Sequence, residues 1–525
     1  MRSAALSSLS FVPLQFPGDS MTSYPHEKRP VLIGVGQCTH RSADPADIIT
    51  PLSLIEAAVR AAEADAHVKS LAQKADTLCL VNMFSMPEGN PLAALTSHLD
   101  INPSRQMYTW IGATAPQWFV NHAAEKIIAG DARIVLICGG EALHSKKIDA
   151  RSKGIRYEQW NYPVKEPWMV GDLRDPFTPM ELKYNLILPI HIYPLFEHAL
   201  RHHEALSIEN HRKDLGDFCS GFSSIASQNE HAWFNTKRSG DEIALPGDTN
   251  PMISFPYTKL MCSIMQVDQA AALFLTDETT ARELGVPREK WIYLTGSGDA
   301  SNIWHVSERI DYFSSPAAVV AVGKALEQAG VTLEDIGMFD FYSCFPSAAR
   351  IVRSTLGISK NDPRPLTVTG GMACFGGPGN NYALHAICAM TERLRSAPDK
   401  IGLVQALSWF INKHSVGVYS ARGSDTPVRR IPPEMYQKAL DILQGPRLAE
   451  DAVGDAVAET YTLFHDRSGR PVDAVIIGRL DDGRRFLSKL EKNNDILDAM
   501  TKHEFVGRRG KVEHRDGYYV FRFQG

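Results

Sequence analysis

A cysteine just before a predicted helix is the first candidate for chemistry in this sequence. Cys344 follows an apolar stretch, 338–341, and precedes Pro346, which suits a first helical turn because its missing N–H would have had no partner there. Helix starts carry unpaired N–H groups and the positive end of the helix dipole, and both favour a thiolate. We therefore expect a lowered pKa at Cys344 and a sulfur that acts as a base or a nucleophile. The alternative is a buried, inert cysteine.

A glycine-rich loop is the second candidate. Residues 369–381 precede a predicted helix over 382–394. The glycines let backbone N–H groups approach a ligand closely, and either asparagine at the end of the loop suits a helix N-cap. The loop is not of the Walker type, because no Gly-Lys-Ser/Thr follows. Two interpretations of the loop stay open, namely contact with a ligand and a surface turn. The candidate ligand-binding residues of this loop are Gly370, Gly371, Gly376, Gly377, Asn380 and Asn381.

The histidines supply the other titratable candidates. His414 follows a predicted buried strand over 402–407 and is a candidate proton carrier, with a core histidine as the equal alternative. His191, His202 and His203 lack acidic or cysteine partners at ligand spacing, and the eight cysteines include no C-x-x-C pair. We therefore predict no metal site.

Length and composition narrow the class of protein. The chain has 525 residues, enough for two to four domains, and its 44% hydrophobic and 22% charged residues are typical of a globular protein. A net charge of −5 gives no general attraction to nucleic acid or to an anionic membrane. No apolar run reaches the roughly 18 residues of a membrane span, and dispersed cysteines fit a reducing cytoplasm. The first 28 residues read as a disordered tail without a signal peptide, and Met21 is an alternative start.

Two parts of the sequence repeat one pattern. Each part contains a strand, a helix opened by proline and a second strand, at 31–36, 50–64 and 77–81 in the first and at 291–296, 315–320 and 338–341 in the second. Strands that alternate with helices indicate an α/β layered fold, and the repeat indicates a duplication. The site would then lie between the halves, at helix N-termini that point inward. The segment 143–261 breaks the rhythm and reads as a mostly helical lid or specificity region.

The end of the chain predicts a small β-barrel. Strand patterns at 458–464 and 472–480 are bounded by tight turns, and Asp516-Gly517 is a hairpin signal. OB-type barrels often bind oligonucleotides, so the arginines of this region deserve a test as a basic surface. They are Arg467, Arg470, Arg479, Arg484, Arg485, Arg508 and Arg509. Because acidic residues interleave with them, we favour a solvated or domain-packing surface and expect no nucleic-acid partner.

Several spaced motifs resemble those of the thiolase superfamily. Asp268-Gln269-Ala270-Ala271-Ala272 resembles the Asp-Gly-Ala-Ala-Ala entry into the last strand of the first half. Tyr342-Ser343-Cys344-Phe345 stands where sterol-carrier-type thiolases have His-Asp-Cys-Phe, and Gly376-Gly377-Pro378 stands where the family has Gly-His-Pro. The likeness spans 29–421 and, with the barrel, is similar to bacterial thiolase-like proteins of type 1, often labelled acetyl-CoA acetyltransferases. It implies a duplicated α-β-α-β-α fold with a helical loop domain and a C-terminal OB-like barrel.

Departures from the family pattern change the chemistry that the resemblance implies. The stretch of the nucleophilic cysteine is Gly112-Ala113-Thr114-Ala115, with no thiol, and the activating histidine is Gly377. The last acid/base cysteine is missing from 405–410, so only Cys344 keeps its family role in proton transfer. Thr114 would need an adjacent base to act as a nucleophile, and the sequence does not show one.

The resemblance still implies a site for an acyl thioester. Gly112, Ala113 and Thr114 at one helix start, with the glycine-rich loop, are expected to hold the thioester oxygen. Tyr342 would hydrogen-bond the oxyanion or its water, and His414 would carry a proton. We therefore predict an acyl-CoA enzyme that performs acyl or CoA transfer, or Claisen or retro-Claisen chemistry that includes hydrolytic cleavage. Coenzyme A would be substrate or product and not a bound cofactor, and the assembly would be a monomer or a homodimer.

Two alternatives stay open beside the enzyme. One is a non-catalytic carrier or scaffold that binds CoA or an acyl thioester, and the other is nucleic-acid binding through the barrel. The expected divisions of the chain are a tail (1–28), a first thiolase half (29–285) with its loop region (143–261), a second half (286–430), a helix and linker (431–455) and the barrel (456–525).

Overall fold

A nine-stranded sheet forms the centre of the computed structural model, which describes residues 28–86, 89–155, 166, 168–423 and 430–524. Its strand order is β3-β2-β4-β7-β1-β8-β11-β10-β9. The first half of the chain supplies β1 (Pro30–Thr39), β2 (Thr77–Leu80), β3 (Arg105–Tyr108), β4 (Ile134–Ala142) and β7 (Asp268–Asp277). The second half supplies β8 (Ile292–Ser301), β9 (Met338–Phe341), β10 (Ile401–Ser408) and β11 (Lys413–Ser420). The halves join where β1 and β8 pair antiparallel.

The predicted duplication is confirmed by this topology. β1 and β8 each lead to a helix that proline opens, α1 (Pro51–Ala66) and α11 (Pro316–Ala329). The hydroxyl oxygens of Thr50 and Ser315 cap these helices by accepting backbone N–H bonds. In each half the next strand lies parallel to a later one, β2 beside β4 and β9 beside β10. Two equivalent α/β units therefore lie side by side.

Matching glycines let each repeat pack its first helix closely on its first strand. A Cβ at Gly36 would overlap the carbonyl oxygen of Ala58 in α1, and a Cβ at Gly298 would overlap that of Ala321 in α11. Only glycine allows such an approach of helix backbone to strand. The same solution in both halves keeps each helix in register with its strand.

Two buried helices pack against strands of both halves, and the residues before their starts are bonded, since Gly112 donates to Asn380. They are α4 (Ala115–Ala129), which leads into β4, and α13 (Tyr382–Ser396), which leads into β10. Both contact strands of the two halves and each other. The other helices of the halves are α2 (Leu71–Lys74), α3 (Pro91–Leu99), α10 (Glu278–Glu283) and α12 (Pro346–Thr355), with short 3-10 turns at Lys259–Met261, Arg288–Lys290 and Val306–Glu308.

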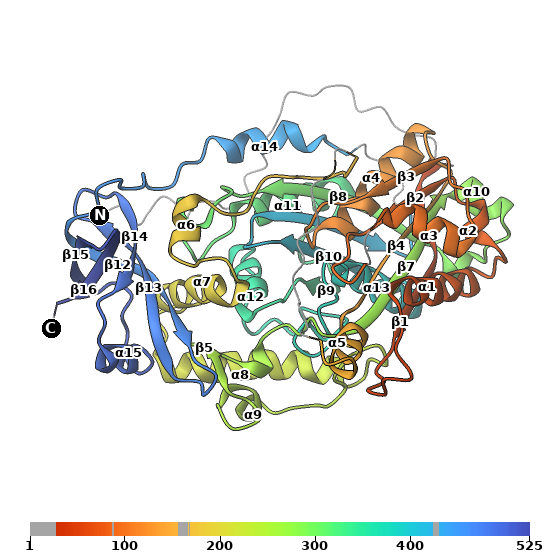
Figure 1. Cartoon of the computed structure of the whole chain (residues 1–525). Helices are drawn as coiled ribbons and strands as arrows, with labels where there is room; N and C mark the ends of the chain where they lie inside the picture. Colours follow the sequence, from red (N-terminus) through yellow and green to blue (C-terminus); the bar gives the residue numbers. More distant parts are fainter. Residues whose placement is uncertain (1–27, 87–88, 156–165, 167, 424–429, 525) are drawn as a thin grey trace.

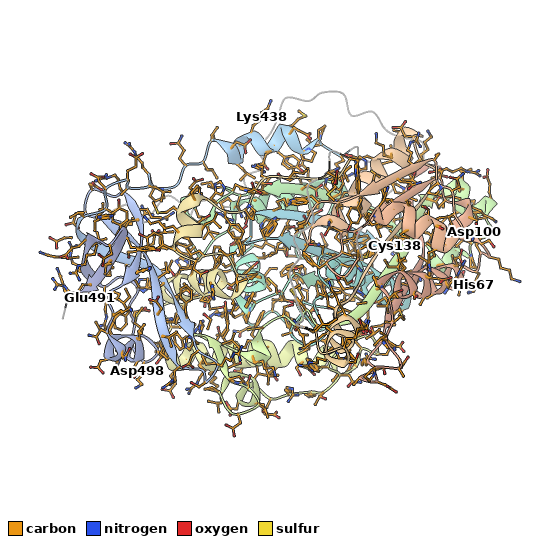
Figure 2. The ribbon with its side chains drawn as sticks, in the orientation of Figure 1. His67, Asp100, Cys138, Lys438, Glu491 and Asp498 are labelled. Carbon is orange, nitrogen blue, oxygen red and sulfur yellow. The ribbon has the colours of Figure 1, made fainter. Side chains whose placement is uncertain are left out.

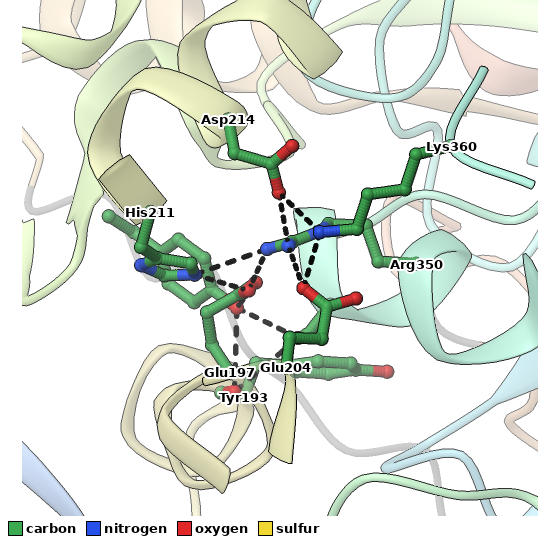
Figure 3. A network of polar contacts seen from close by, with 9 residues as sticks. Tyr193, Glu197, Glu204, His211, Asp214, Arg350 and Lys360 are labelled. Atoms are coloured by element: carbon green, nitrogen blue, oxygen red, sulfur yellow. Dashed lines mark hydrogen bonds and ion pairs between the residues drawn. The ribbon is translucent and has the colours of Figure 1, made fainter. Parts of the chain in front are cut away.

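The segment between β4 and β7 is mostly helical, as predicted. It contains α5 (Leu143–Ser152), α6 (Pro179–Lys183), α7 (Pro189–His203), α8 (Ile208–Ala226) and α9 (Gly240–Ala244), with two short strands, β5 (Met252–Ser254) and β6 (Tyr257–Thr258). Buried Arg350 on α12 fastens this segment by ion pairs to Glu197 of α7 and to Glu204 and Asp214 (Figure 3). The segment is thus anchored to the second repeat as well as to the first.

A closed five-stranded barrel ends the chain and lies at the end of the molecule opposite to α1 and α2 (Figure 1). Its strands pair in the order β12-β13-β14-β16-β15, and β15 closes on β12. They are β12 (Gly454–His465), β13 (Pro471–Leu480), β14 (Arg485–Leu490), β15 (Arg509–Arg515) and β16 (Tyr518–Phe523), with α15 (Asn494–Met500) between β14 and β15. The helix α14 (Pro433–Asp441) connects the second half to this barrel.

The arginines of the barrel serve mainly internal pairing. Arg485 is fully buried, pairs with Glu459 and donates to backbone carbonyls of 307–310, which docks the barrel on the second half. Arg484 pairs with Asp451 and Asp482, and Arg509 pairs with Asp481. These contacts match the domain-packing alternative, because paired charges leave little field for a phosphate backbone.

Among the residues that the structure describes, no helix is both long and apolar enough to cross a membrane. The same residues contain no group of three or more histidine, cysteine or acidic side chains placed to hold a metal ion.

Candidate functional site

Cys344 lies just before α12, which begins at Pro346 as predicted, but its pKa moves the other way. Burial raises the pKa of the Cys344 thiol to about 12, and this outweighs the opposing hydrogen bonds from Tyr193 and from the backbone at the helix start. The predicted lowering of the Cys344 pKa is therefore wrong. Desolvation in this site is stronger than the helix dipole, so the sulfur is a neutral thiol at neutral pH.

The surroundings of Cys344 come from the segment after the loop region. The backbone N–H of Ser263 donates to the carbonyl oxygen of Cys344 over 3.0 Å, and burial also raises the pKa of neighbouring Cys262 to about 12. The Tyr342 side chain is buried edge-on against Tyr382, with ring centroids 5.6 Å apart, and burial raises its pKa far above the ordinary value. This environment suits packing, and it supplies no charge that would activate the thiol.

The glycine-rich loop is built into the protein interior. Several backbone N–H groups that were predicted to contact a ligand instead donate to protein oxygens. Gly370 donates to Thr367, Gly371 to Thr369 and Gly377 to Ile264. The side chains of Asn380 and Asn381 donate to the carbonyl oxygens of Asn82 and Gly139. Internal bonds thus use the donors that the sequence assigned to coenzyme A.

Gly377 shows why a histidine is absent at this point of the loop. A Cβ at Gly377 would overlap the hydroxyl oxygen of Ser263. Ser263, from the segment that also contacts Cys344, therefore occupies the space in which a side chain would begin. Glycine is also required at a second position of the loop, since a Cβ at Gly371 would overlap the ring of Phe222 in α8.

His414 is a buried histidine that is bonded on both ring nitrogens. Its Nε2 lies 2.9 Å from the hydroxyl oxygen of Ser315 and its Nδ1 lies 2.9 Å from Nε2 of Gln405. Burial lowers the pKa of His414 to about 3, so the ring is neutral at neutral pH. Since Ser315 caps α11, this geometry matches the core-histidine alternative that the sequence left open.

The start of α4 carries a different kind of site. Gly112 donates its N–H to Oδ1 of Asn380 over 2.9 Å, and Thr114 donates its N–H to Oγ of Ser408 over 2.8 Å. The hydroxyl groups of Thr114 and Ser408 also lie 2.8 Å apart. Two of the backbone donors expected to hold a thioester oxygen are thus engaged, and a pair of hydroxyl groups takes their place.

A cavity of about 430 Å³ opens beside this hydroxyl pair. Thr114 and Gly112 from the start of α4, Lys413 and His414 from β11, and Asp172 from the loop region are among its lining residues. Cys344 is not one of them. The cavity therefore combines a helix start, hydroxyl groups and one amine, while the thiol belongs to another part of the molecule.

Lys413 is the group at this cavity that sequence reasoning missed. Ser408 and Lys413 are directly opposite each other in the antiparallel β10–β11 pair, so their side chains are neighbours on one face. A Cβ at Gly112 would lie 3.1 Å from Ser408 Oγ and 3.2 Å from Lys413 Nζ, so both atoms face the same point above the glycine. The only available signal was a lysine beside His414 at the beginning of an apolar strand.

Burial also sets the electrostatics of the cavity. It lowers the pKa of Lys413 to about 8, an effect that Asp172 opposes and Arg174 adds to. The carboxylate of Asp172 is itself paired with Arg174 over 2.6 Å, and Asp299 is paired with Arg430. Asp172 and Asp299 thus have their own cations, and neither carboxylate is a dedicated counter-charge of the Lys413 amine.

With fold and site in view, the architecture is that of a thiolase-type protein with an added barrel. Residues 436–517 match the model of the thiolase-like protein type 1 additional C-terminal domain. A solved structure of a monomeric SCP2-thiolase-like protein type 1 from Mycobacterium smegmatis is 30% identical, with a TM-score of 0.80, over 95% of this chain and 100% of that one. The chain belongs to the SCP2-thiolase-like proteins of type 1.

Two solved structures with lower sequence identity show the fold alone. The Ltp2-ChsH2(DUF35) aldolase structure is 16% identical with a TM-score of 0.58, over 76% of this chain and 99% of that chain. Human mitochondrial 3-ketoacyl-CoA thiolase is 14% identical with a TM-score of 0.54, over 75% of this chain and 100% of that chain. A curated acetyl-CoA acetyltransferase of Methanocaldococcus jannaschii is 30% identical over 135 residues, which cover 26% of this chain and only 33% of that protein.

Proposed function

We propose that this protein acts on an acyl thioester, with acyl-CoA as the substrate class, in the cavity at the start of α4. The observation that carries the proposal is the hydroxyl pair of Thr114 and Ser408 at a helix start, beside a 430 Å³ cavity. A volume of this size is typical of small-molecule sites, and a few convergent polar groups fix a ligand's orientation. The name of the acetyl-CoA acetyltransferase relative supports the substrate class.

The hydroxyl pair can bind the carbonyl oxygen of a thioester. Only one hydrogen lies between Thr114 Oγ1 and Ser408 Oγ, and Thr114 lines the cavity while buried Ser408 does not. When Ser408 donates to Thr114 Oγ1, the Thr114 hydroxyl hydrogen is free to donate to a ligand. Such a donor strengthens as negative charge develops on the oxygen, and one donor of this type stabilises a transition state by about 3–4 kcal/mol. This geometry supports acyl transfer or Claisen-type chemistry, with coenzyme A as substrate or product.

Cys344 is the rival centre for the same reaction class. Its pKa of about 12 leaves almost no thiolate at neutral pH, which weakens its case as base or nucleophile. A non-catalytic acyl-thioester carrier is the second rival, since the cavity would bind a thioester with or without turnover. Binding of nucleic acid by the barrel has less support, because Arg484, Arg485 and Arg509 pair with acids.

The test is incubation of the purified protein with a panel of acyl-CoA and β-ketoacyl-CoA compounds and mass spectrometry of the products. The variants are Thr114→Val, which removes the hydroxyl at constant shape, and Cys344→Ala, with Thr96→Val in α3 as the matched control. We expect product formation that Thr114→Val reduces about 100-fold or more and that Cys344→Ala retains.

Three other results would change this assignment. Loss of product only in Cys344→Ala would move the chemistry to α12. Coenzyme A binding without any product would favour the carrier, and neither binding nor product would reject the proposed function. We also propose a monomer, like the Mycobacterium smegmatis protein, which light scattering of the eluted protein measures.

A further inference from the structure

We propose that Lys413 is the base of this cavity and removes a proton from the carbon next to the thioester carbonyl. This inference rests on the proposed function for the substrate class only, and it assigns the proton acceptor to a residue outside the thiolase motifs. The geometry points to Lys413 by three independent features: its place in the strand pair, its lack of a partner and its position relative to the oxygen-binding hydroxyl groups.

The strand pair fixes where the amine lies. Lys413 is the first residue of β11 and is directly opposite Ser408, the last residue of β10. Ser408 Oγ in turn bonds both the N–H and the hydroxyl of Thr114. Lys413, Ser408 and Thr114 therefore form one cluster, held by a hairpin register and by the first turn of a buried helix.

The amine of Lys413 has no dedicated partner within the described part of the chain. Among the described residues, no hydrogen bond or ion pair joins Lys413 Nζ to another residue. The nitrogen lies over the ring of Trp304, 5.7 Å from the ring centroid. The fully buried cations Arg350 and Arg485 are instead each paired with carboxylates. The side chain of Lys413 is half-buried, and partial desolvation without a paired carboxylate favours the neutral amine, so Lys413 is suited to accept a proton beside the cavity.

The neighbouring charges agree with a neutral amine near pH 8. Burial lowers the pKa of Lys413 to about 8, and the positive charge of Arg174 acts in the same direction. The titratable and charged groups that line the cavity are Asp172, Arg174, Asp299, His414, Lys413, Glu434 and Asp441. Asp172 favours the charged amine, but Arg174 already pairs with it, and Asp299 pairs with Arg430. His414 is neutral, with a pKa near 3.

The proposed step is a simple proton transfer. The thioester oxygen accepts the free hydroxyl hydrogen of the Thr114–Ser408 pair, and the neutral amine of Lys413 takes one α-proton. The C–H bond breaks, its electron pair forms the enolate, and the nitrogen becomes an ammonium group. Return of a proton from the ammonium to carbon regenerates the thioester, so the step has no net redox change and needs no co-reactant.

The other titratable candidates fit this role less well. A base for proton transfer works best when its pKa lies near the working pH. His414 has both ring nitrogens bonded and a pKa near 3, and Cys344 has a pKa near 12 and is not among the residues that line the cavity. Among the described residues that line the cavity, Lys413 is the one whose pKa lies near the working pH.

Deuterium exchange tests this step without requiring a complete reaction. Acetyl-CoA, and acetyl-N-acetylcysteamine as a thioester without the nucleotide, are incubated with the whole protein in D2O, and mass spectrometry follows deuterium in the acetyl group. We expect exchange that increases with pH through about 8, as the amine becomes neutral. Lys413→Arg keeps the positive charge but cannot act as a base near neutral pH, so exchange should fall 100-fold or more.

A matched control and a fold measurement separate catalysis from misfolding. Lys438 on α14 is exposed, as Figure 2 shows, and Lys438→Arg should leave exchange unchanged. Lys413→Met, a neutral side chain of similar length, should also lose exchange while its melting temperature stays at or above that of the native protein, because a half-buried amine without a paired carboxylate has been removed.

The outcomes also separate this inference from the proposed function. Exchange that depends on Lys413 without any acyl product supports the inference and rejects acyl transfer. Acyl products that persist in Lys413→Arg overturn the inference and leave the proposed function intact. Absence of exchange in the native protein, or exchange that survives in a folded Lys413→Arg, overturns the inference.

Discussion

The starts of α4 and α12 differ although both combine a helix N-terminus with a candidate for chemistry. At α12, burial raises the pKa of Cys344 to about 12. At α4, the hydroxyl groups of Thr114 and Ser408 meet a lysine whose pKa burial lowers to about 8. Desolvation always favours the neutral form, so it silences a thiol but activates an amine. The same burial therefore has opposite chemical consequences at the two helix starts.

The two regions also differ in how they are held. Around α12, buried Arg350 joins α7, α8 and α12 through Glu197, Glu204 and Asp214 (Figure 3). At the start of α4, Gly112 and Thr114 make neutral hydrogen bonds and a cavity remains. We interpret the α12 region as a structural anchor and the α4 region as the reactive one.

The largest effect that we expect tests the anchor. Arg350→Met leaves the carboxylate of Glu197 buried without its main cation, so the free energy of unfolding should fall by about 3–5 kcal/mol. Chemical denaturation measures this loss. Arg60→Met, which breaks only partly exposed pairs with Glu56 and Glu63 in α1, is the control and should cost less than about 1 kcal/mol. Equal losses in the two variants would contradict an anchor at α12.

The second prediction concerns the reactivity of Cys344. With a pKa of about 12, its thiol should react with iodoacetamide at pH 7.5 about 100-fold more slowly in the native protein than in the unfolded chain. Peptide mass spectrometry after timed labelling gives the rate at this residue. Labelling of native Cys344 that is faster than in the unfolded chain would indicate a thiolate and would restore it as the reactive group.

The third prediction compares two glycines, one from each region. Gly377→Ala forces a Cβ into the hydroxyl oxygen of Ser263, so we expect a loss of about 1–3 kcal/mol in stability. Gly112→Ala places a methyl group between Ser408 and Lys413 at 3.1 and 3.2 Å, which the flexible lysine can accommodate. Its stability should change by less than about 1 kcal/mol, while deuterium exchange should fall about tenfold.

Thermal melts and exchange rates of the two alanine variants provide the comparison. Native exchange by a folded Gly112→Ala protein would show that the space above Gly112 is not where the thioester binds. A stable Gly377→Ala protein would show that Ser263 can move, and that the loop is less tightly packed than its contacts indicate.

Local patterns explain how much of the fold could be predicted. The proline-opened helices α1 and α11 and the buried strands β1 and β8 follow from residues that are adjacent in the sequence, and the thiolase-like motifs supplied the arrangement. The β-barrel followed in the same way from short strands and tight turns. These features need no knowledge of distant contacts.

The site could be predicted only in part, because its energetics depend on distant residues. The start of α12 was predicted correctly, yet the pKa of Cys344 depends on burial beside Cys262 and Ser263 from another segment. The hydroxyl partner of Thr114 could not be predicted because Ser408 is 294 positions away, and Lys413 lies opposite Ser408 only through strand register. Contacts of this kind are invisible to spacing rules.

Titration of the lysine side chains by NMR is the most direct test of the contrast between the two helix starts. In protein labelled with carbon-13 at the lysine ε-carbons, the resonance that disappears in Lys413→Arg belongs to Lys413. We predict that this resonance titrates with a pKa near 8. A pKa of 10 or above would mean that the amine is charged at neutral pH, and it would contradict the central claim that burial prepares Lys413 for proton transfer.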